Sequence, residues 1–331
     1  MSGFRALQIE KTDDSFDRSI VERTTADLPD GEVLIDVRYS SLNYKDGMSA
    51  TGSPGVTRNY PHTPGIDAAG VVVESTNAEF APGDEVIVIG FDLGMNTAGG
   101  FGQRIRVPAG WIVARPDGLT LEESMIIGTA GFTAALCVHK LEHVGMTPAA
   151  GPVLVTGATG GVGSVAVMLL NKLGYTITAV TGKQSQHGFL RDLGATEILS
   201  REQAREGSDR ALLKEVWGGA VDTLGGEILW NAVKGLRYGQ SLAACGLVDS
   251  TQISASVLPF ILRHVNLLGI DSVQLPLTQK AEIWQKLAGP WKLDGLATLK
   301  EAFTLETISV GIDRILAGEM VGRGVLEHRT G

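Results

Sequence analysis

The sequence predicts an α/β protein of two domains, in which a β-rich unit is joined to a doubly wound parallel sheet. Three observations predict this. At 331 residues the chain exceeds the usual size of one hydrophobic core. Residues 1–125 carry strand patterns without helix-strand alternation, whereas strands and helices alternate between residues 153 and 273. The alternation then stops, so the last residues are expected to rejoin the first unit.

The N-terminal unit is expected to be all-β or α+β, with a barrel as its form. Its strand patterns are EVLIDVRYSSLN (32–43), AAGVVVEST (68–76), DEVIVIG (84–90) and GQRIRVP (102–108). After Ser272 the sequence predicts a helix (279–288), a segment 305–317 and a last strand (324–328). The expected domains are therefore residues 1–125 with 273–331, and residues 126–272.

The second unit is predicted element by element. A buried strand, Val153–Thr156, precedes a helix with apolar spacing from Val162 to Leu173. The later predicted elements are strand 176–180, helix 186–193, strand 196–200, strand 220–225, helix 226–236, strand 241–246 and strand 265–273. Six strands with helices between them predict a dinucleotide-binding fold, whose ligand lies along the carboxyl ends of the strands.

A glycine-rich turn joins the first strand and helix of that unit. Gly157, Gly160, Gly161 and Gly163 give the spacing G-x-x-G-G-x-G, which departs from the usual G-x-G-x-x-G. Such a turn lets backbone N–H groups and the positive helix end approach a pyrophosphate. The alternative is a purely structural turn.

The next strand predicts which nucleotide binds. It ends in Thr181-Gly182-Lys183, and no acidic residue that could bind ribose hydroxyls appears before Asp192. Lys183 and Arg201 can pair with a 2′-phosphate, which favours NADP(H) over NAD(H). The alternative is that both are solvated surface cations. Asp222 is read as a local hydrogen-bonding residue without a catalytic role.

The composition limits the kinds of binding partner, cellular compartment and metal site that we expect. A net charge of −9 and a sequence pI of about 5.2 argue against nucleic acid and anionic membranes. Two cysteines, Cys137 and Cys245, suit a reducing cytoplasm, and the N-terminus lacks the apolar core of a signal peptide. The six histidines are scattered, so no metal site is expected.

Four stretches together resemble the medium-chain dehydrogenase/reductase superfamily, in its acryloyl-CoA reductase and quinone oxidoreductase-like branch. They are SLNYKDGMSATG (41–52), PGIDAAGVV (64–72), IIGTAGFTAALCV (126–138) and VTGATGGVGSVAV (155–167). The resemblance implies a GroES-like β-barrel catalytic domain and a Rossmann domain. Zinc alcohol dehydrogenases of this superfamily carry G-H-E-x-x-G where this chain has Gly65-Ile66-Asp67-Ala68-Ala69-Gly70, and their catalytic cysteine falls near Asn43, so zinc is not expected.

The resemblance also implies roles for residues. Tyr44 is expected to donate to an oxyanion, hold the nicotinamide or relay a proton; the alternative is a packed Tyr whose hydroxyl bonds to backbone. Arg323 is expected to serve catalysis by recognising the substrate's phosphates, or else to be a surface arginine; Arg58, Arg104 and Arg106 are other candidates. Thr129 either contacts the nicotinamide or caps a helix. The expected cofactor-binding residues are Tyr44, Thr129, Thr159, Gly160, Gly161, Val162, Thr181, Gly182, Lys183, Arg201, Leu247, Ile261 and Ser272.

The expected function is NADPH-dependent reduction of the conjugated C=C bond of acryloyl-CoA to propionyl-CoA, without a metal. An alkene conjugated to a carbonyl is already electrophilic, so hydride addition needs no Lewis acid. The alternatives are an NADPH:quinone or enone reductase and, from another class, a non-catalytic NADPH-binding sensor. A homodimer through the apolar stretch Ile253–Ile270 is expected; the alternative is that this stretch belongs to an intramolecular core.

Overall fold

The computed structural model describes residues 3–13 and 15–328. The chain divides into two compact units: unit 1 holds residues 1–129 and 273–331, and unit 2 holds residues 130–272. The first crossing lies after Thr129 rather than after residue 125. The intervening residues stay with unit 1 because Ile126 and Thr129 are hydrogen-bonded to Arg323 and Asp67 of that unit.

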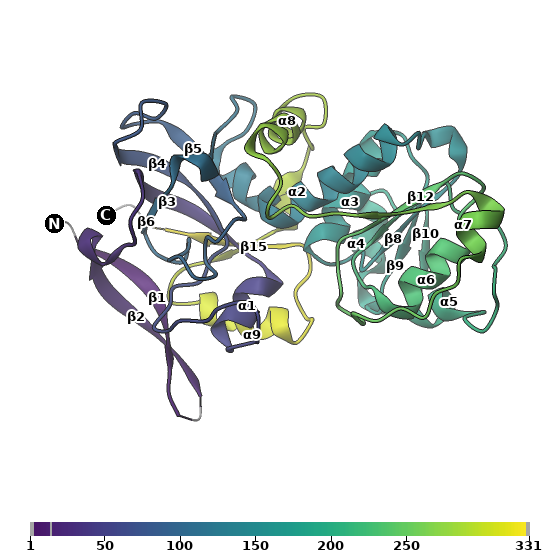
Figure 1. Cartoon of the computed structure of the whole chain (residues 1–331), viewed down its shortest axis with the longest axis horizontal. Coiled ribbons are helices and arrows are strands. Elements are labelled where there is room, and N and C mark those ends of the chain that lie inside the picture. The colour runs from purple at the N-terminus through teal and green to yellow at the C-terminus, as the bar shows by residue number, and fades with distance from the viewer. Residues whose placement is uncertain (1–2, 14, 329–331) are drawn as a thin grey trace. The chain divides into compact units, whose positions relative to one another are not determined.

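Unit 1 contains a hairpin and a seven-stranded sheet (Figure 1). The hairpin strands are β1 (Gly3–Lys11) and β2 (Phe16–Thr24). The larger sheet has the order β14-β15-β3-β4-β5-β7, with β6 paired to β3. Its strands are β3 (Val33–Leu42), β4 (Asp67–Ser75), β5 (Glu85–Ile89), β6 (Arg104–Val107), β7 (Ile112–Ala114), β14 (Lys300–Phe303) and β15 (Arg323–Glu327). All of these pairings are antiparallel except that between β14 and β15.

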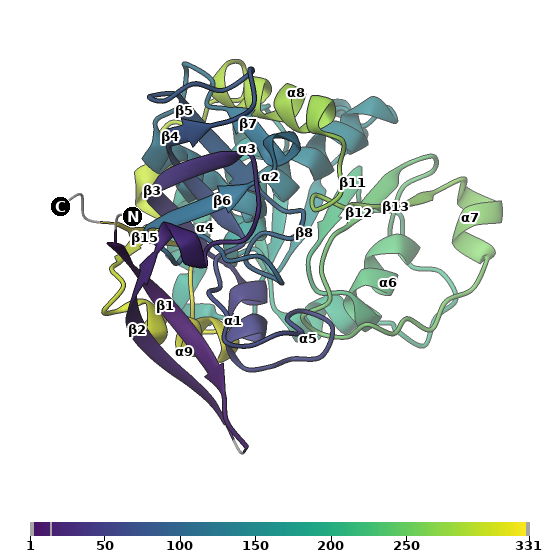
Figure 2. The same ribbon diagram turned by 60° about the vertical axis from the view of Figure 1, so that its left-hand side comes forward.

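The strand patterns seen in the sequence form this sheet because their alternate residues are apolar. Val33, Ile35 and Val37 of β3, for example, point into one buried cluster with Val86 and Val88 of β5. The hairpin was not expected. Figures 1 and 2 show β1 and β2 extending away from the rest of unit 1, and most of β2 is only half-buried, which weakens the apolar signal.

The helices of unit 1 are short, apart from the one that leads into unit 2. They are α1 (Tyr44–Ala50), α8 (Leu277–Ala288) and α9 (Ile308–Leu316), together with the first part of α2 (Leu121–His143). Gly128 breaks α2, with φ 50° and ψ −163°. By length and composition α2 is able to cross a membrane, but 78% of its apolar stretch is buried inside the protein, as in the core helix of a globular fold.

Unit 2 is a six-stranded parallel sheet with the order β10-β9-β8-β11-β12-β13. The strands are β8 (Val153–Thr156), β9 (Ile177–Val180), β10 (Glu197–Leu199), β11 (Gly219–Asp222), β12 (Ser241–Ala244) and β13 (Asn266–Gly269). The connecting helices are α3 (Gly161–Lys172), α4 (His187–Asp192), α5 (Arg201–Arg205), α6 (Gly226–Lys234) and α7 (Leu258–Arg263). The strand order reverses beside β8, which is the point where doubly wound sheets bind ligands. The predicted α/β class and the six strands are confirmed, while α5 and α7 were not expected.

Candidate active site

The carboxyl edge of the sheet in unit 2 brings most of the predicted cofactor residues together. Because the strands are parallel, each strand contributes the residues that follow its last position. Thr159, Gly160, Gly161 and Val162 follow β8; Thr181, Gly182 and Lys183 follow β9; Arg201 follows β10; Leu247 follows β12; and Ser272 follows β13. The sheet therefore assembles residues from five separate segments at one edge.

The glycine-rich turn packs tightly against the neighbouring strand. Gly157 has φ +60°, and a Cβ atom there would lie 2.2 Å from Thr223 Oγ1. Gly160 is the N-cap of α3, so the first turn of that helix faces the same edge. Thr159 lies within hydrogen-bond distance of Thr181, with 3.3 Å between their hydroxyl oxygens. The turn thus offers a backbone cradle next to the end of β9, which suits a pyrophosphate.

Two cations lie beside this cradle. Thr181 Oγ1 accepts a hydrogen bond of 3.1 Å from the backbone N–H of Lys183, which fixes the loop after β9. A Cβ atom on Gly182 would lie 3.4 Å from Arg201 Nε, so the guanidinium stem packs over this glycine. Arg201 Nε is buried, and within the part of the chain that the structure describes it has no hydrogen-bond partner. A buried donor without a partner is costly, and a bound anionic oxygen would satisfy it.

One of the predicted cofactor residues of unit 2 lies elsewhere. Ile261 is 69% exposed on α7, and that helix leads into the amino end of β13. Arg263, at the end of the same helix, donates hydrogen bonds to the backbone carbonyls of Leu213 and Lys234, and Lys234 ends α6, the helix that leads to the start of β12. Both contacts are at the amino edge of the sheet. Ile261 therefore lies away from the predicted residues at the carboxyl edge, and the structure does not bring it together with them.

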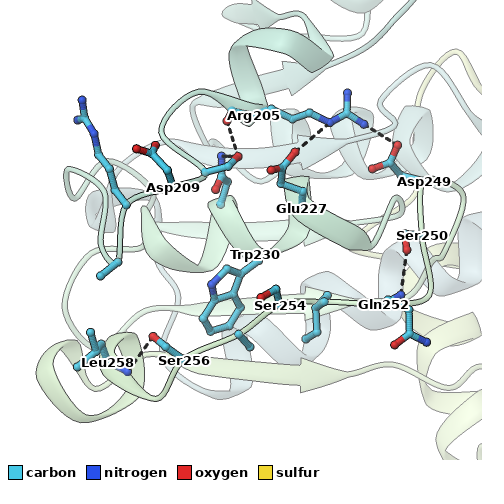
Figure 3. Close-up of a pocket in the computed structure, with 16 residues that line it drawn as sticks. Arg205, Asp209, Glu227, Trp230, Asp249, Ser250, Gln252, Ser254, Ser256 and Leu258 are labelled. Atoms are coloured by element: carbon cyan, nitrogen blue, oxygen red, sulfur yellow. Dashed lines mark hydrogen bonds and ion pairs between the residues drawn. The ribbon is translucent and has the colours of Figure 1, made fainter.

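Unit 2 also has a cavity of about 820 Å³ that none of the predicted cofactor residues lines (Figure 3). It lies between α6, the end of α5 and the segment 249–258. In it Arg205 bridges Glu227 and Asp249, and Trp230 forms part of the wall (Figure 3). The arginine is held by two carboxylates, which makes this cavity a poor site for an additional anion.

Tyr44 is the first residue of α1 in unit 1 and is separated from the end of β3 by Asn43 alone. Its side chain is 43% exposed. Within residues 3–13 and 15–328 its hydroxyl has no hydrogen-bond partner, so the alternative of a packed tyrosine bonded to backbone is not what the structure shows. An exposed phenol can donate to an oxyanion or pass a proton.

A buried hydrogen-bond network lies behind Tyr44 and centres on Asp67, the first residue of β4. Asp67 Oδ2 accepts hydrogen bonds from Ser41 Oγ, from Asn43 Nδ2 at 2.8 Å and from the backbone N–H of Thr129 at 2.8 Å. Its Oδ1 accepts one from Thr129 Oγ1. The break at Gly128 leaves the N–H of Thr129 without a helical partner, and Asp67 caps it. The hydroxyl hydrogen of Thr129 is also committed to Asp67, so its oxygen can act only as an acceptor toward a ligand.

Arg323 belongs to this network and not to an open surface. It is 2% exposed, its Nε donates a 2.9 Å hydrogen bond to the carbonyl of Ile126, and both terminal nitrogens lie 3.3 Å from Asn43 Oδ1. A Cβ atom on Gly128 would come within 2.7 Å of the guanidinium, so the helix break is what makes room for it. This position does not allow contact with the phosphates of CoA. The structure corrects that expectation and gives Arg323 a supporting role under the site.

Asp46 is the second buried carboxyl group here. Its Oδ2 accepts from the N–H of Asn43 at 2.8 Å, and its Oδ1 accepts from the N–H groups of Gly65 and Ile66 at 3.0 and 2.9 Å. Burial, reinforced by the nearby Asp67, raises the pKa of Asp46 to about 7. Asp46 thus ties the start of α1, and with it Tyr44, to the loop before β4.

Of the other arginines suggested for substrate binding, two are already engaged. Arg104 forms a 2.7 Å ion pair with Asp36, and Arg106 donates to the carbonyl of Thr25. Arg58 is exposed, and among the residues that the structure describes its guanidinium has no ion-pair partner. Sequence reasoning missed Asp67 as the centre of the network, although its place after Ile66 was noted, because its partners come from distant parts of the chain.

Comparison with known proteins agrees with this arrangement. Residues 29–117 match the alcohol dehydrogenase GroES-like domain family, and residues 161–288 match the zinc-binding dehydrogenase family. The chain is 43% identical over 327 residues to the acrylyl-CoA reductase AcuI of Ruegeria pomeroyi, covering 98% of this chain and 99% of that protein. The chain belongs to the medium-chain dehydrogenase/reductase superfamily. Within this superfamily it falls in the acrylyl-CoA reductase and quinone oxidoreductase-like branch and is an oxidoreductase.

Two solved structures of this branch are similar over nearly the whole chain. The yhdH oxidoreductase of Salmonella enterica, in complex with NADP, has a TM-score of 0.95 at 43% identity and covers 98% of this chain and 100% of that chain. The yhfP protein of Bacillus subtilis, with NAD bound, has a TM-score of 0.97 at 44% identity and covers 99% and 100%. The branch therefore includes structures with either nucleotide bound, and the residues of this chain must indicate its preference.

The superfamily also contains zinc enzymes, so the side chains at the zinc-ligand positions of this chain decide whether the metal would fit. No group of three or more His, Cys, Asp or Glu side chains suited to a metal occurs among residues 3–13 and 15–328. At the position of the zinc-ligating histidine stands Ile66, a buried aliphatic residue. Near the position of the catalytic cysteine, the Asn43 amide bridges Asp67 and Arg323. These side chains do not fit zinc.

Proposed function

We propose that this protein is an NADPH-dependent acryloyl-CoA reductase that forms propionyl-CoA without a metal. The observation that supports it most is the 43% identity, over nearly the full length of both proteins, to a relative named as an acrylyl-CoA reductase. A side-chain set that does not fit zinc agrees with a substrate that is itself electrophilic. The two free cysteines suit a reducing cytoplasm as the place of action.

Unit 2 fits NADP(H). The glycine-rich turn offers the pyrophosphate cradle, while Lys183 and the buried, partnerless Arg201 Nε suit a 2′-phosphate. Bound NADPH supplies the hydride. Leu247 and Ser272, after the last strands of the sheet, are proposed to contact the nicotinamide half.

Unit 1 supplies the groups that act on the substrate. The exposed Tyr44 hydroxyl is proposed to donate to the thioester oxygen as negative charge develops there, or to deliver the proton to the α-carbon. Thr129, whose hydroxyl hydrogen Asp67 accepts, is proposed to accept a hydrogen bond from the carboxamide of the nicotinamide. Arg58, which is exposed, is proposed in place of Arg323 to bind a phosphate of CoA.

The test compares acceptors and one variant. Purified protein should oxidise NADPH quickly with acryloyl-CoA, more slowly with crotonyl-CoA and hardly with free acrylate or a soluble quinone. Tyr44→Phe should lower kcat with acryloyl-CoA by about 10²-fold or more, the range expected for a lost proton donor, and leave the Kd for NADPH nearly unchanged. Both are measured by the absorbance of reduced nicotinamide and by titration.

Tyr238→Phe is the matched control, because Tyr238 is also exposed but lies in unit 2 after α6. It should behave as the wild type. Turnover of quinones alone would overturn the proposal in favour of a quinone or enone reductase. The relative YhfP is the reason for considering this alternative, since it is named as a quinone oxidoreductase and is 45% identical over 325 residues. Tight NADPH binding without any turnover would favour a sensor.

We further propose that two copies of the chain associate through unit 2. The strand β13 ends the sheet, so its outer edge offers unpaired backbone groups. On the preceding α7 and the residue before it, Val257, Ile261 and Leu262 are 65%, 69% and 57% exposed. An open strand edge beside exposed aliphatic side chains suits a second copy of the same surface.

The double variant Ile261→Asp/Leu262→Asp should convert a dimer into a monomer, because two charges would be buried without partners. Light scattering coupled to gel filtration measures the mass. Val310→Asp is the control, since Val310 is 57% exposed on α9 of unit 1 and should leave the dimer intact. A monomeric wild type, or a dimer that persists in the double variant, would contradict this interface.

A further inference from the structure

Asp222, the last residue of β11, joins three strand ends at the carboxyl edge of unit 2. It is 0% exposed. Its Oδ1 accepts a 2.6 Å hydrogen bond from Thr156 Oγ1 at the end of β8, and its backbone carbonyl accepts a 2.9 Å bond from the N–H of Cys245, just after β12. The second carboxylate oxygen accepts a 2.7 Å bond from the N–H of Gly225, in the turn before α6. One residue thus fixes the three segments that leave β8, β11 and β12.

Thr156 connects Asp222 to the glycine-rich turn. Its hydroxyl donates to Asp222 and accepts a 3.0 Å hydrogen bond from the N–H of Thr223, so both of its functions are used. The Thr223 hydroxyl in turn donates to the carbonyl of Thr156 at 2.9 Å. Gly157, the next residue, packs directly on that hydroxyl. Three hydrogen bonds therefore hold the start of the turn, and two of them are made by the Thr156 hydroxyl.

We propose that Asp222 and Thr156 are positioning residues for the dinucleotide: they hold the glycine-rich turn in the conformation that receives the pyrophosphate. This inference rests on the proposed binding of NADP(H) by unit 2. Neither side chain is offered as a ligand, since both are fully buried. Their effect is to fix the backbone N–H groups before the nucleotide arrives, which lowers the entropic cost of binding.

The geometry separates this role from that of Lys183 and Arg201. Those two side chains follow β9 and β10 and suit the 2′-phosphate, whereas the pair Thr156–Asp222 governs only the turn after β8 and the neighbouring strand ends. Adenosine 2′-monophosphate carries the 2′-phosphate but has no pyrophosphate. A defect in the turn should therefore weaken NADPH binding and spare adenosine 2′-monophosphate, which a general loss of folding would not do.

Burial raises the pKa of Asp222 to about 6, and the hydrogen bonds from Thr156 and the backbone N–H of Gly225 oppose that rise. Binding should be measured well above this pH, where the carboxylate is ionised and accepts from both donors.

The experiment measures the Kd values of NADPH and adenosine 2′-monophosphate by calorimetry for the full chain. Thr156→Val and Asp222→Asn both keep the shape of the side chain. Thr156→Val removes the hydrogen bond between the two residues, and Asp222→Asn removes the charge that strengthens it. Each should raise the Kd of NADPH by about tenfold or more, the effect of losing a hydrogen bond to a charged group. The Kd of adenosine 2′-monophosphate should change by less than about twofold. Thr156→Ser keeps the hydroxyl and should restore NADPH binding.

Arg201→Ala is the opposite control and should weaken the binding of both ligands. The inference is overturned if Thr156→Val binds NADPH as tightly as Thr156→Ser, or if Thr156→Val weakens both ligands equally. Failure of the proposed function would give a different result. In that case the wild type itself would bind neither ligand, and the inference would fail with the proposed function.

Discussion

Replacing Arg323 by methionine should lower the free energy of unfolding by about 3–5 kcal/mol, the cost of removing one partner from a group of buried charges. Burial lowers the pKa of the Arg323 guanidinium, and the nearby buried carboxyl groups of Asp67 and Asp46 oppose that lowering, so this positive charge balances theirs. Its loss would also leave the carbonyl of Ile126 and the amide oxygen of Asn43 without these donors. Urea denaturation followed by circular dichroism measures the change.

Arg314→Met is the matched control. Arg314 pairs with Glu301, and both side chains are more than a third exposed, so its replacement should change stability by about 1 kcal/mol at most. If Arg323→Met instead kept its stability and raised only the KM for acryloyl-CoA, the original expectation of a phosphate-binding arginine would be right and the buried network would not carry the stability assigned to it.

The double variant Lys183→Ala/Arg201→Ala should lower kcat/KM with NADPH by about a hundredfold or more, because each charge-assisted contact to the 2′-phosphate contributes about 1.5–3 kcal/mol. With NADH, which lacks that phosphate, the change should stay within about threefold. The packing of Arg201 over Gly182, with its Nε buried and unpartnered, is the reason for expecting so large an effect. Steady-state kinetics with both nucleotides gives the ratio.

Arg205→Ala serves as the control for this prediction. Arg205 is the last residue of α5, the helix that Arg201 begins, but it is held by Glu227 and Asp249 at the separate cavity of Figure 3. It should leave the preference between NADPH and NADH unchanged. An unchanged preference in the double variant would mean that the two cations are solvated surface groups and that the nucleotide is chosen by other contacts.

Local patterns were enough to predict most of unit 2. Apolar spacing and glycine positions are short-range features, and they indicated the strand β8, the turn at Gly157 and the helix α3. The elements that were missed are those with weak local signals. Most of β2 is only half-buried, the buried residues of β1 do not alternate strictly, and α5 and α7 are only five and six residues long.

Among the candidate site residues, too, those with a clear local signal were the ones that could be placed from the sequence. Residues that directly follow a predicted strand were placed well, because a parallel sheet brings all carboxyl ends to one edge. Ile261 does not lie at that edge, since it belongs to a helix that returns the chain to the amino edge before β13. Tyr44 was found from the motif that surrounds it, but its exposure could not be read from that motif.

By itself, the sequence determined the α/β class, the order of the six parallel strands along the chain, the glycine-rich turn and the cations that follow β9 and β10. Only the tertiary structure decided what the buried polar residues do. Arg323 and Asn43 are 280 positions apart, and Thr156 and Asp222 are 66 apart, yet both pairs are in hydrogen-bond contact. Polar groups removed from water must find partners, and which partners they find depends on how distant segments pack, a property that no local pattern encodes.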